Sequence, residues 1–199
     1  MEVARNFINT SDFLSQRQFD EHIKLYKGYV GKVNEITNDL ASFEGRDKAN
    51  ATYSQYRGLK KGESYALDGM ILHELYFPLL GSKQTQPMPK TMDIFDDYFG
   101  GYENWRSDFV ACGLAARGWA VLIYEQRTGS YRNILLDSHD DGLVCGGFPL
   151  IILDVYEHAY FIDYGTDKGQ YIDKFINSLC WDLVEKKAAI VGLAVPRHP

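Results

Sequence analysis

Apolar and aromatic side chains recur at intervals of three and four residues early in the chain, which is the period of an amphipathic helix. The first such run begins after Ser15 and continues to about Leu40. Ser15 and Gln18 have the spacing of a capping box, in which each residue bonds the backbone of the other, and this favours a helix start there. The apolar face contains Phe19, His22, Tyr26, Tyr29 and Val33.

A second helix is predicted from about Ser64, after a polar connection over residues 43–62 that has room for some helix of its own. Its apolar face contains Ala66, Gly69, Met70, His73 and Phe77. Pro78 and Gly81 bring it to an end. Two helices joined in this way form an antiparallel α-hairpin.

Residues 81–92 contain two prolines and almost no apolar periodicity, which is typical of a connection between domains. We place the boundary near residue 88. The sequence thus predicts an N-terminal α-hairpin domain over residues 1–88 and a C-terminal domain over residues 89–199.

The second half begins with helical patterns over residues 93–99 and 103–116 and then becomes rich in β-forming side chains. The predicted strands are 119–124, 131–136 and 150–154, the first two joined as a hairpin. From about residue 156 the pattern is helical again, with apolar faces that contain His158, Phe161, Ile162, Tyr171, Phe175 and Leu179. We expect an α+β fold whose C-terminal domain holds a three-stranded antiparallel sheet.

Composition narrows the functional classes. The 199 residues are 45% apolar, enough for a substantial core, but no apolar run reaches the eighteen or so residues that span a membrane. The first residues lack the basic and apolar pattern of a secretion signal, so we expect a cytoplasmic protein with no membrane partner. A formal charge of −6 argues against nucleic acid as a partner. The three cysteines lie far apart, and we expect reduced thiols.

Four histidines outside the C-terminal tail carry the candidate chemistry: His22, His73, His139 and His158. Asp154 and His158 stand four apart where a strand gives way to a helix, so their side chains can converge. His22 and His73 lie on the apolar faces of the two antiparallel helices, so they can approach each other across the helix interface. A single buried histidine is usually an ordinary core residue, but several buried ionisable groups are costly unless they are paired or ligated. Three imidazoles and one carboxylate suit iron, manganese or zinc.

The segment DVYEHAYFIDYGTDKGQYIDKFINSLCWDLVEKK, which begins at Asp154, resembles the C-terminal signature of iron/manganese superoxide dismutases. Upstream, FGGYENWRSDF and GWAVLIY are similar to a helix and a strand of that family, so the resemblance covers residues 95–187. Members of the family have an α-hairpin domain followed by an α/β domain with a three-stranded antiparallel sheet. The resemblance therefore implies the same fold as the hydrophobic pattern.

The resemblance implies that Asp154, His158 and His73 are metal ligands, the last in the segment ILHELYFPLLG. It implies His22 as the remaining ligand, in EHIKLYKGYVGKVNEI, and Tyr29 as the tyrosine at the mouth of the substrate channel. The interval between His22 and Tyr29 is one residue shorter than is usual in the family. Depending on where that gap falls, the family's second histidine is replaced by Leu25 or by Tyr26.

In this family a glutamine hydrogen-bonds the metal-bound solvent from one of two positions. Gly69 stands at the first, while His139, in LLDSHDDG, falls on the second, as it does in some members. The alternative for His139 is a histidine in an ordinary polar turn. Glu157 matches the glutamate that reaches across the dimer to the partner's last ligand, and Tyr160 matches the tyrosine that bonds the missing histidine. As plain structure, Glu157 is equally a solvated helix residue.

Three aromatic positions near the family's metal differ here. Tryptophans are usual where this chain has Phe77, Val121 and Tyr156, whereas Trp119 and Trp181 are retained. Two of the replacements keep an aromatic ring, so we expect a dry pocket with altered packing. The difference bears on catalytic rate rather than on the type of reaction.

The resemblance implies superoxide dismutation with one iron or manganese ion per subunit, iron being preferred, in a homodimer or a dimer of dimers. Tyr29 and His139 are expected to deliver protons, and Lys27 and Lys32 are candidates for attracting the anionic substrate. The alternative within the family is a weak or inactive protein that keeps the metal. A non-haem iron oxygenase is a further alternative, but such sites usually use two histidines and one carboxylate.

Overall fold

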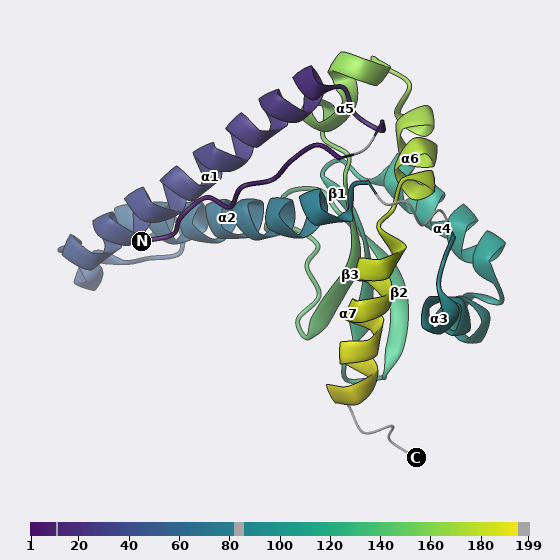
Figure 1. The fold of residues 1–199 in the computed structure, drawn as a ribbon. Coiled ribbons are helices and arrows are strands. Elements are labelled where there is room, and N and C mark those ends of the chain that lie inside the picture. The colour runs from purple at the N-terminus through teal and green to yellow at the C-terminus, as the bar shows by residue number, and fades with distance from the viewer. Residues whose placement is uncertain (11, 82–85, 195–199) are drawn as a thin grey trace.

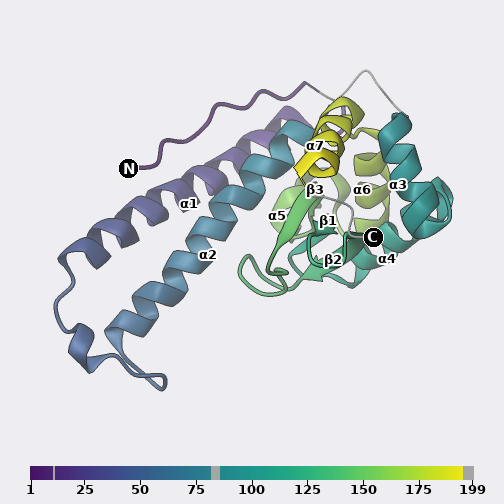
Figure 2. The same cartoon turned by 90° about the horizontal axis from the view of Figure 1, so that it is seen from below.

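Two long antiparallel helices form an arm that projects from an α/β part of the molecule (Figure 1). The computed structural model describes residues 1–10, 12–81 and 86–194. Helix α1 spans Gln16–Ser42 and helix α2 spans Gln55–Tyr76, with a short 3₁₀ turn η1, Arg46–Lys48, between them. The two helices lie side by side in both views (Figures 1 and 2), which confirms the predicted α-hairpin.

Both helices begin at serine caps, but only the start of α1 was predicted correctly from the sequence. Ser15 Oγ accepts the N–H of Gln18 at 3.1 Å, whereas the Gln18 side chain does not return to Ser15, so the capping box is only half formed. Helix α2 begins at Gln55 after its own cap, Ser54, and not at about Ser64. Its first turns lie at the exposed end of the arm, where no apolar stripe is needed to mark a helix.

The N-terminal segment runs along the arm in an extended conformation (Figure 2). The backbone N–H of Arg5 donates to the Tyr26 hydroxyl at 2.8 Å, and its guanidinium pairs with Glu74 at 2.8 Å. Tyr26 in turn donates to Glu74 at 2.8 Å. These contacts tie the first residues to both α1 and α2.

Three antiparallel strands form the sheet in the order β2-β1-β3, which confirms the predicted hairpin and third strand. They are β1 Trp119–Glu125, β2 Ser130–Leu136 and β3 Gly147–Asp154. The central strand β1 is almost entirely buried, as its run of apolar residues requires. Strand β3 ends at Asp154. The Asp154 carboxylate therefore lies at the end of the sheet that packs against the helical arm.

Helices cover the sheet and complete the core. They are α3 Pro89–Phe99, α4 Tyr102–Ala115, α5 Glu157–Tyr164, α6 Lys168–Asn177 and α7 Trp181–Ala194, with a 3₁₀ turn η2, Phe77–Leu79, after α2. Helix α4 packs on β1 and β2, while α2 and α7 pack on β3. Trp105, Trp119 and Trp181 are fully buried at the centre. The α+β class is therefore confirmed.

The predicted apolar face of helix α5 is only partly buried. Phe161 and Ile162 are 48% and 44% exposed, whereas Tyr171, Phe175 and Leu179 are buried as predicted. Only Ala159 and Tyr160 of this eight-residue helix pack fully inward, so its other side faces solvent. Cys112, Cys145 and Cys180 are all free thiols.

Two parts of the sequence expectations fall on residues that are not described. Residues 82–85 belong to the predicted interdomain connection, and residues 195–199 form the C-terminal tail. Among the helices of the described residues, none combines the length and apolar character required to cross a membrane.

Candidate metal centre

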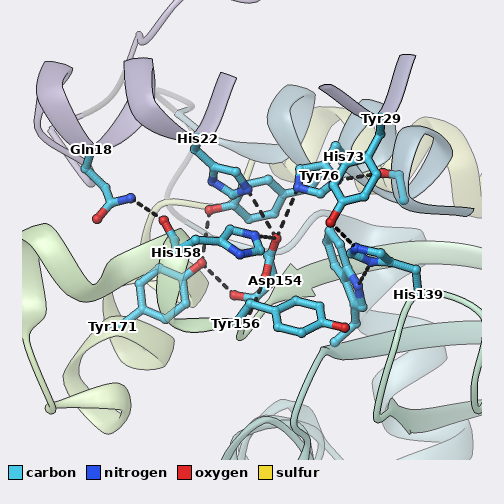
Figure 3. A network of polar contacts seen from close by, with 12 residues as sticks. Gln18, His22, Tyr29, His73, Tyr76, His139, Asp154, Tyr156, His158 and Tyr171 are labelled. Carbon is cyan, nitrogen blue, oxygen red and sulfur yellow. Dashed lines mark hydrogen bonds and ion pairs between the residues drawn. The ribbon is translucent and has the colours of Figure 1, made fainter. Parts of the chain in front are cut away.

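Four side chains from four elements converge between the arm and the sheet (Figure 3). His22 comes from α1, His73 from α2, Asp154 from the last position of β3 and His158 from the first turn of α5. One ligand atom from each lies within 4.8 Å of all the others. The spacing of Asp154 and His158 brings these two together locally, and the packing of α1 against α2 adds His22 and His73, as their places on the apolar helix faces predicted.

One carboxylate oxygen is the centre of this cluster. Asp154 Oδ2 lies 3.2 Å from His22 Nε2, 3.2 Å from His158 Nε2 and 3.5 Å from His73 Nε2. The other oxygen, Oδ1, accepts the backbone N–H of Tyr156 at 3.0 Å, which fixes the carboxylate at the start of α5. His22, His73 and Asp154 are completely buried, while the His158 side chain is 25% exposed.

The proton positions on His73 test whether a cation fits this cluster. His73 Nδ1 lies 2.6 Å from the backbone oxygen of Gly69, and because a carbonyl only accepts, Nδ1 carries the proton. Burial, with His22 as a neighbour, lowers the pKa of His73 to about 3, so the ring is neutral. Its buried Nε2 then carries a lone pair that has no hydrogen-bond partner among the described residues and lies near a carboxylate oxygen. A cation between these two acceptors satisfies both.

The charges around Asp154 also favour the ionised form of its carboxylate. Burial opposes ionisation of Asp154, but His158 and His22 outweigh it and hold the pKa of the carboxyl well below its usual range. Burial lowers the pKa of His22 despite the nearby carboxylate. Burial also acts against a charged His158, yet Asp154 raises the pKa of that ring overall. One buried anion with three imidazoles is a donor set that suits iron, manganese or zinc.

His139 and Tyr29 form a hydrogen-bonded pair beside the cluster. Trp119 Nε1, which can only donate, bonds His139 Nδ1 at 2.9 Å, so the neutral ring carries its proton on Nε2. That Nε2–H donates to the Tyr29 hydroxyl at 2.7 Å. Burial lowers the pKa of His139 to about 4 and raises that of Tyr29 above its usual range, so both stay neutral. The Tyr29 ring lies 5.4 Å from the His73 ring, centroid to centroid.

Gly69 leaves the space that this pair occupies. A Cβ atom at this position would lie 2.9 Å from Tyr29 Cδ1 and 3.1 Å from His139 Cδ2. Both distances are too short for an ordinary carbon contact. A side chain on α2 at position 69 is therefore incompatible with the observed positions of Tyr29 and His139.

Aromatic rings surround the imidazoles. Phe77 lies 4.9 Å from His22, and Trp119 lies 5.1 Å from His73, both in edge-on arrangements. Tyr156 stacks on His158 at 5.2 Å. Val121 is buried in the middle of β1. The pocket therefore retains aromatic walls at Phe77 and Tyr156, as their ring character predicted.

The remaining sequence candidates lie farther out. Glu157 is exposed on α5, next to His158, and Tyr160 is buried against Tyr171 at 4.9 Å between ring centroids. Lys27 is exposed on α1, and Lys32 pairs with Glu35 at 2.6 Å.

The two residues that the resemblance offers in place of the family's second histidine differ in burial. Tyr26 points inward and is fully buried, whereas Leu25 is 42% exposed. Tyr26 is thus the residue that occupies the interior on this turn of α1.

Several residues at the site were missed by sequence reasoning. Gln18 bonds the backbone of α5, and Tyr171 donates from its hydroxyl to the carbonyl oxygen of Asp154 at 2.8 Å. The Tyr65 ring lies 4.6 Å from that of His139, at the solvent side. Lys61 pairs with Asp140, the neighbour of His139, at 2.8 Å. For Gln18 a signal existed, since it stands one helical turn before a histidine on the buried face of α1.

Comparison with known proteins agrees with this geometry. Residues 87–187 match the family model of iron/manganese superoxide dismutases, C-terminal domain. An iron superoxide dismutase of Aquifex aeolicus is 38% identical over 87% of this chain and 84% of its own. An iron superoxide dismutase of Cupriavidus metallidurans is 37% identical over 82% of each chain. A manganese superoxide dismutase of Halobacterium salinarum is 35% identical over 81% of this chain and 79% of its own.

Proposed function

The chain belongs to the iron/manganese superoxide dismutase family, and on that premise we propose that His22, His73, Asp154 and His158 hold one iron or manganese ion per subunit. The protein is a superoxide dismutase, an oxidoreductase that converts two superoxide ions and two protons to dioxygen and hydrogen peroxide. When bound by these four side chains, such an ion would supply the one-electron redox chemistry that dismutation needs.

The observation that supports this ligand assignment is the lone pair of His73 Nε2, which lies buried 3.5 Å from an ionised carboxylate oxygen and has no hydrogen-bond partner in the described part of the chain. Two acceptors at that distance repel each other unless a cation lies between them. The equal approach of His22 and His158 to the same oxygen supports a single shared position for that cation.

We propose that His139 and Tyr29 deliver protons to the reduced substrate. Trp119 holds His139 in the tautomer that donates from Nε2, so the Tyr29 oxygen is already an acceptor and its own proton is free to be donated. Tyr29 lies against His73 and therefore reaches the edge of the ligand cluster. A positioned donor supplies the protons that peroxide needs without waiting for bulk water.

We propose iron as the preferred metal. Support comes from the histidine at position 139, which accompanies iron or either-metal use in the family this chain resembles. Similar relatives include both iron and manganese enzymes, so the ligands alone do not choose. Elemental analysis of protein from its native cells, together with the activity of each metal-loaded form, tests this preference.

Three further proposals concern the whole molecule. We propose domains over residues 1–88 and 89–199, a cytoplasmic antioxidant role, and a homodimer or dimer of dimers. The exposed position of Glu157 beside His158 supports the dimer, because its carboxylate can accept a hydrogen bond from a partner subunit there. Sedimentation of the wild type and of Glu157→Gln tests it, and a variant with an unchanged mass would argue against this contact.

The decisive test of the metal assignment is His73→Ala. We expect the variant to lose its metal and its acceleration of superoxide decay, because a ligand is removed from a buried charged site. Leu72→Ala is the matched control, since this neighbour on α2 is also buried but carries no atom that can bind a metal. It should cost about 2–5 kcal/mol of stability and keep the metal. Equal turnover in wild type and His73→Ala would refute the assignment. Tight metal without turnover in the wild type would instead favour the inactive alternative.

A further inference from the structure

Gln18 is a fully buried polar residue that neither binds metal in the proposed site nor completes its own helix cap. It stands on α1, one helical turn before His22. Its side chain reaches the backbone of α5, as Figure 3 shows for its contact with His158. The Nε2 amide donates to the His158 carbonyl oxygen at 2.6 Å, and Oε1 accepts the N–H of Ile162 at 3.0 Å.

The two backbone groups that Gln18 binds are a matched pair. A carbonyl and an N–H four residues apart bond each other in a regular α-helical turn. The amide of glutamine presents one donor and one acceptor side by side, so it can take both as partners at once. A side chain that inserts into this ladder is a recognised cause of helix distortion. The first turn of α5, which carries His158, is thereby fixed to α1.

This link spans two of the proposed ligands. His22 follows Gln18 on α1, and the ring centroids of His22 and His158 lie 5.1 Å apart. Both Nε2 atoms lie 3.2 Å from the same oxygen of Asp154. A second tie joins the same two helices, because the N–H of Ser15 donates to Asp163 Oδ2 at 2.6 Å. Helix α5 is only eight residues long, so such ties strongly influence where it sits.

We propose that Gln18 is a positioning residue for the metal site: through the main chain of His158 it sets the separation between the ligands His22 and His158. The inference rests on the proposed ligand role of His158. It adds a residue that acts on the metal only through another residue, as the hydrogen-bond partners of ligands do in other metal sites.

The test compares Gln18→Met with Gln16→Met. Methionine keeps the length of the side chain and removes both hydrogen bonds. Gln16 is an exposed glutamine on the same helix whose amide donates to Asp20 Oδ1 at 2.8 Å. We expect Gln18→Met to release iron about 10- to 100-fold more readily to a competing chelator and to change the electron paramagnetic resonance spectrum of the ferric protein. Gln16→Met should match the wild type in both measurements.

Gln18→Glu provides a second variant if methionine prevents folding. Its carboxylate can still accept from Ile162 N–H but places a second acceptor against the His158 carbonyl, so we expect the same direction of change. In the wild type, the Gln18 side-chain amide should exchange slowly with solvent, as a buried bonded donor does. Fast exchange of this amide would overturn the proposal without any variant.

A merely structural role gives a different pattern. Gln18→Met would then lower the melting temperature of the metal-free and metal-loaded proteins equally, with unchanged iron release and an unchanged spectrum, and the proposal would be wrong. If His73→Ala loses the metal while both Gln18 variants behave as the wild type, only this inference fails. If the wild type binds no metal, the ligand assignment fails and this inference fails with it.

Discussion

Replacement of Gly69 by alanine adds one methyl group at the point where Tyr29 and His139 meet. The new Cβ would lie 2.9 Å from Tyr29 Cδ1 and 3.1 Å from His139 Cδ2. Carbon atoms in contact are normally about 3.5–4.0 Å apart, so the rings must move by roughly 0.5–1 Å. Those rings are joined by the 2.7 Å bond from His139 to Tyr29, and His139 is held by Trp119. We expect this bond to lengthen or break.

Two opposing contributions set the change in stability. Alanine favours a helix over glycine by about 1 kcal/mol, and Gly69 lies within α2 with no positive φ to prefer glycine. Overpacking of a filled site costs about 1–3 kcal/mol. The free energy of unfolding should therefore fall by about 0–2 kcal/mol. For a chain of this length each kcal/mol lowers the melting temperature by about 2–4 °C.

Gly58→Ala is the matched control on the same helix. A Cβ at Gly58 would meet no atom of the described residues within 4 Å, so this variant should gain up to about 1 kcal/mol from helix preference alone. Thermal unfolding of both variants isolates the steric contribution as their difference, about 1–3 kcal/mol.

Turnover of the same two proteins tests the role of the pair. Superoxide decay should slow by about tenfold or more in Gly69→Ala, because a positioned proton donor contributes on the order of 10²- to 10⁴-fold, and should be unchanged in Gly58→Ala. If Gly69→Ala were as stable and as active as Gly58→Ala, the argument from the crowded Tyr29–His139 pair would be refuted.

Three other outcomes follow from the same geometry. Metal-free protein should lose stability as the pH falls from about 6.5 towards 4, because unfolded histidines take up protons while His139 (pKa about 4) and His73 (pKa about 3) stay neutral when folded. The contribution of His139 should be roughly 1–3 kcal/mol after solvent screening, measurable by urea unfolding at several pH values. Trp119→Phe should slow turnover while iron affinity stays near the wild-type value, because it removes the N–H that fixes the His139 tautomer but keeps an aromatic ring beside the proposed ligand His73. Loss of the metal in this variant would contradict the prediction. Tyr171→Phe should cost about 1–3 kcal/mol by leaving the Asp154 carbonyl without its donor, as denaturant unfolding would measure.

The features that the sequence predicted correctly are those set by interactions between residues a few positions apart. Helix α1, the β1–β2 hairpin and the break after β3 were predictable because their apolar periods and turn residues act within a few positions. The pairing of Asp154 with His158 was predictable for the same reason, since four residues make one helical turn. The start of α2 was missed because its first turns are exposed and need no apolar stripe.

Long-range packing decided the rest. The spacing of Ser15 and Gln18 indicated a local cap, yet the Gln18 amide bonds α5, 140 residues away, because burial there demands partners for two backbone groups. Which turn of α1 faces inward, and hence the burial of Tyr26 over Leu25, depends on the α1–α2 interface. The sequence by itself determined which residue types could bind a metal and where helices would present them. Only the tertiary structure determined that three imidazole nitrogens and one carboxylate oxygen meet within 4.8 Å, because that distance is set by how separate elements pack.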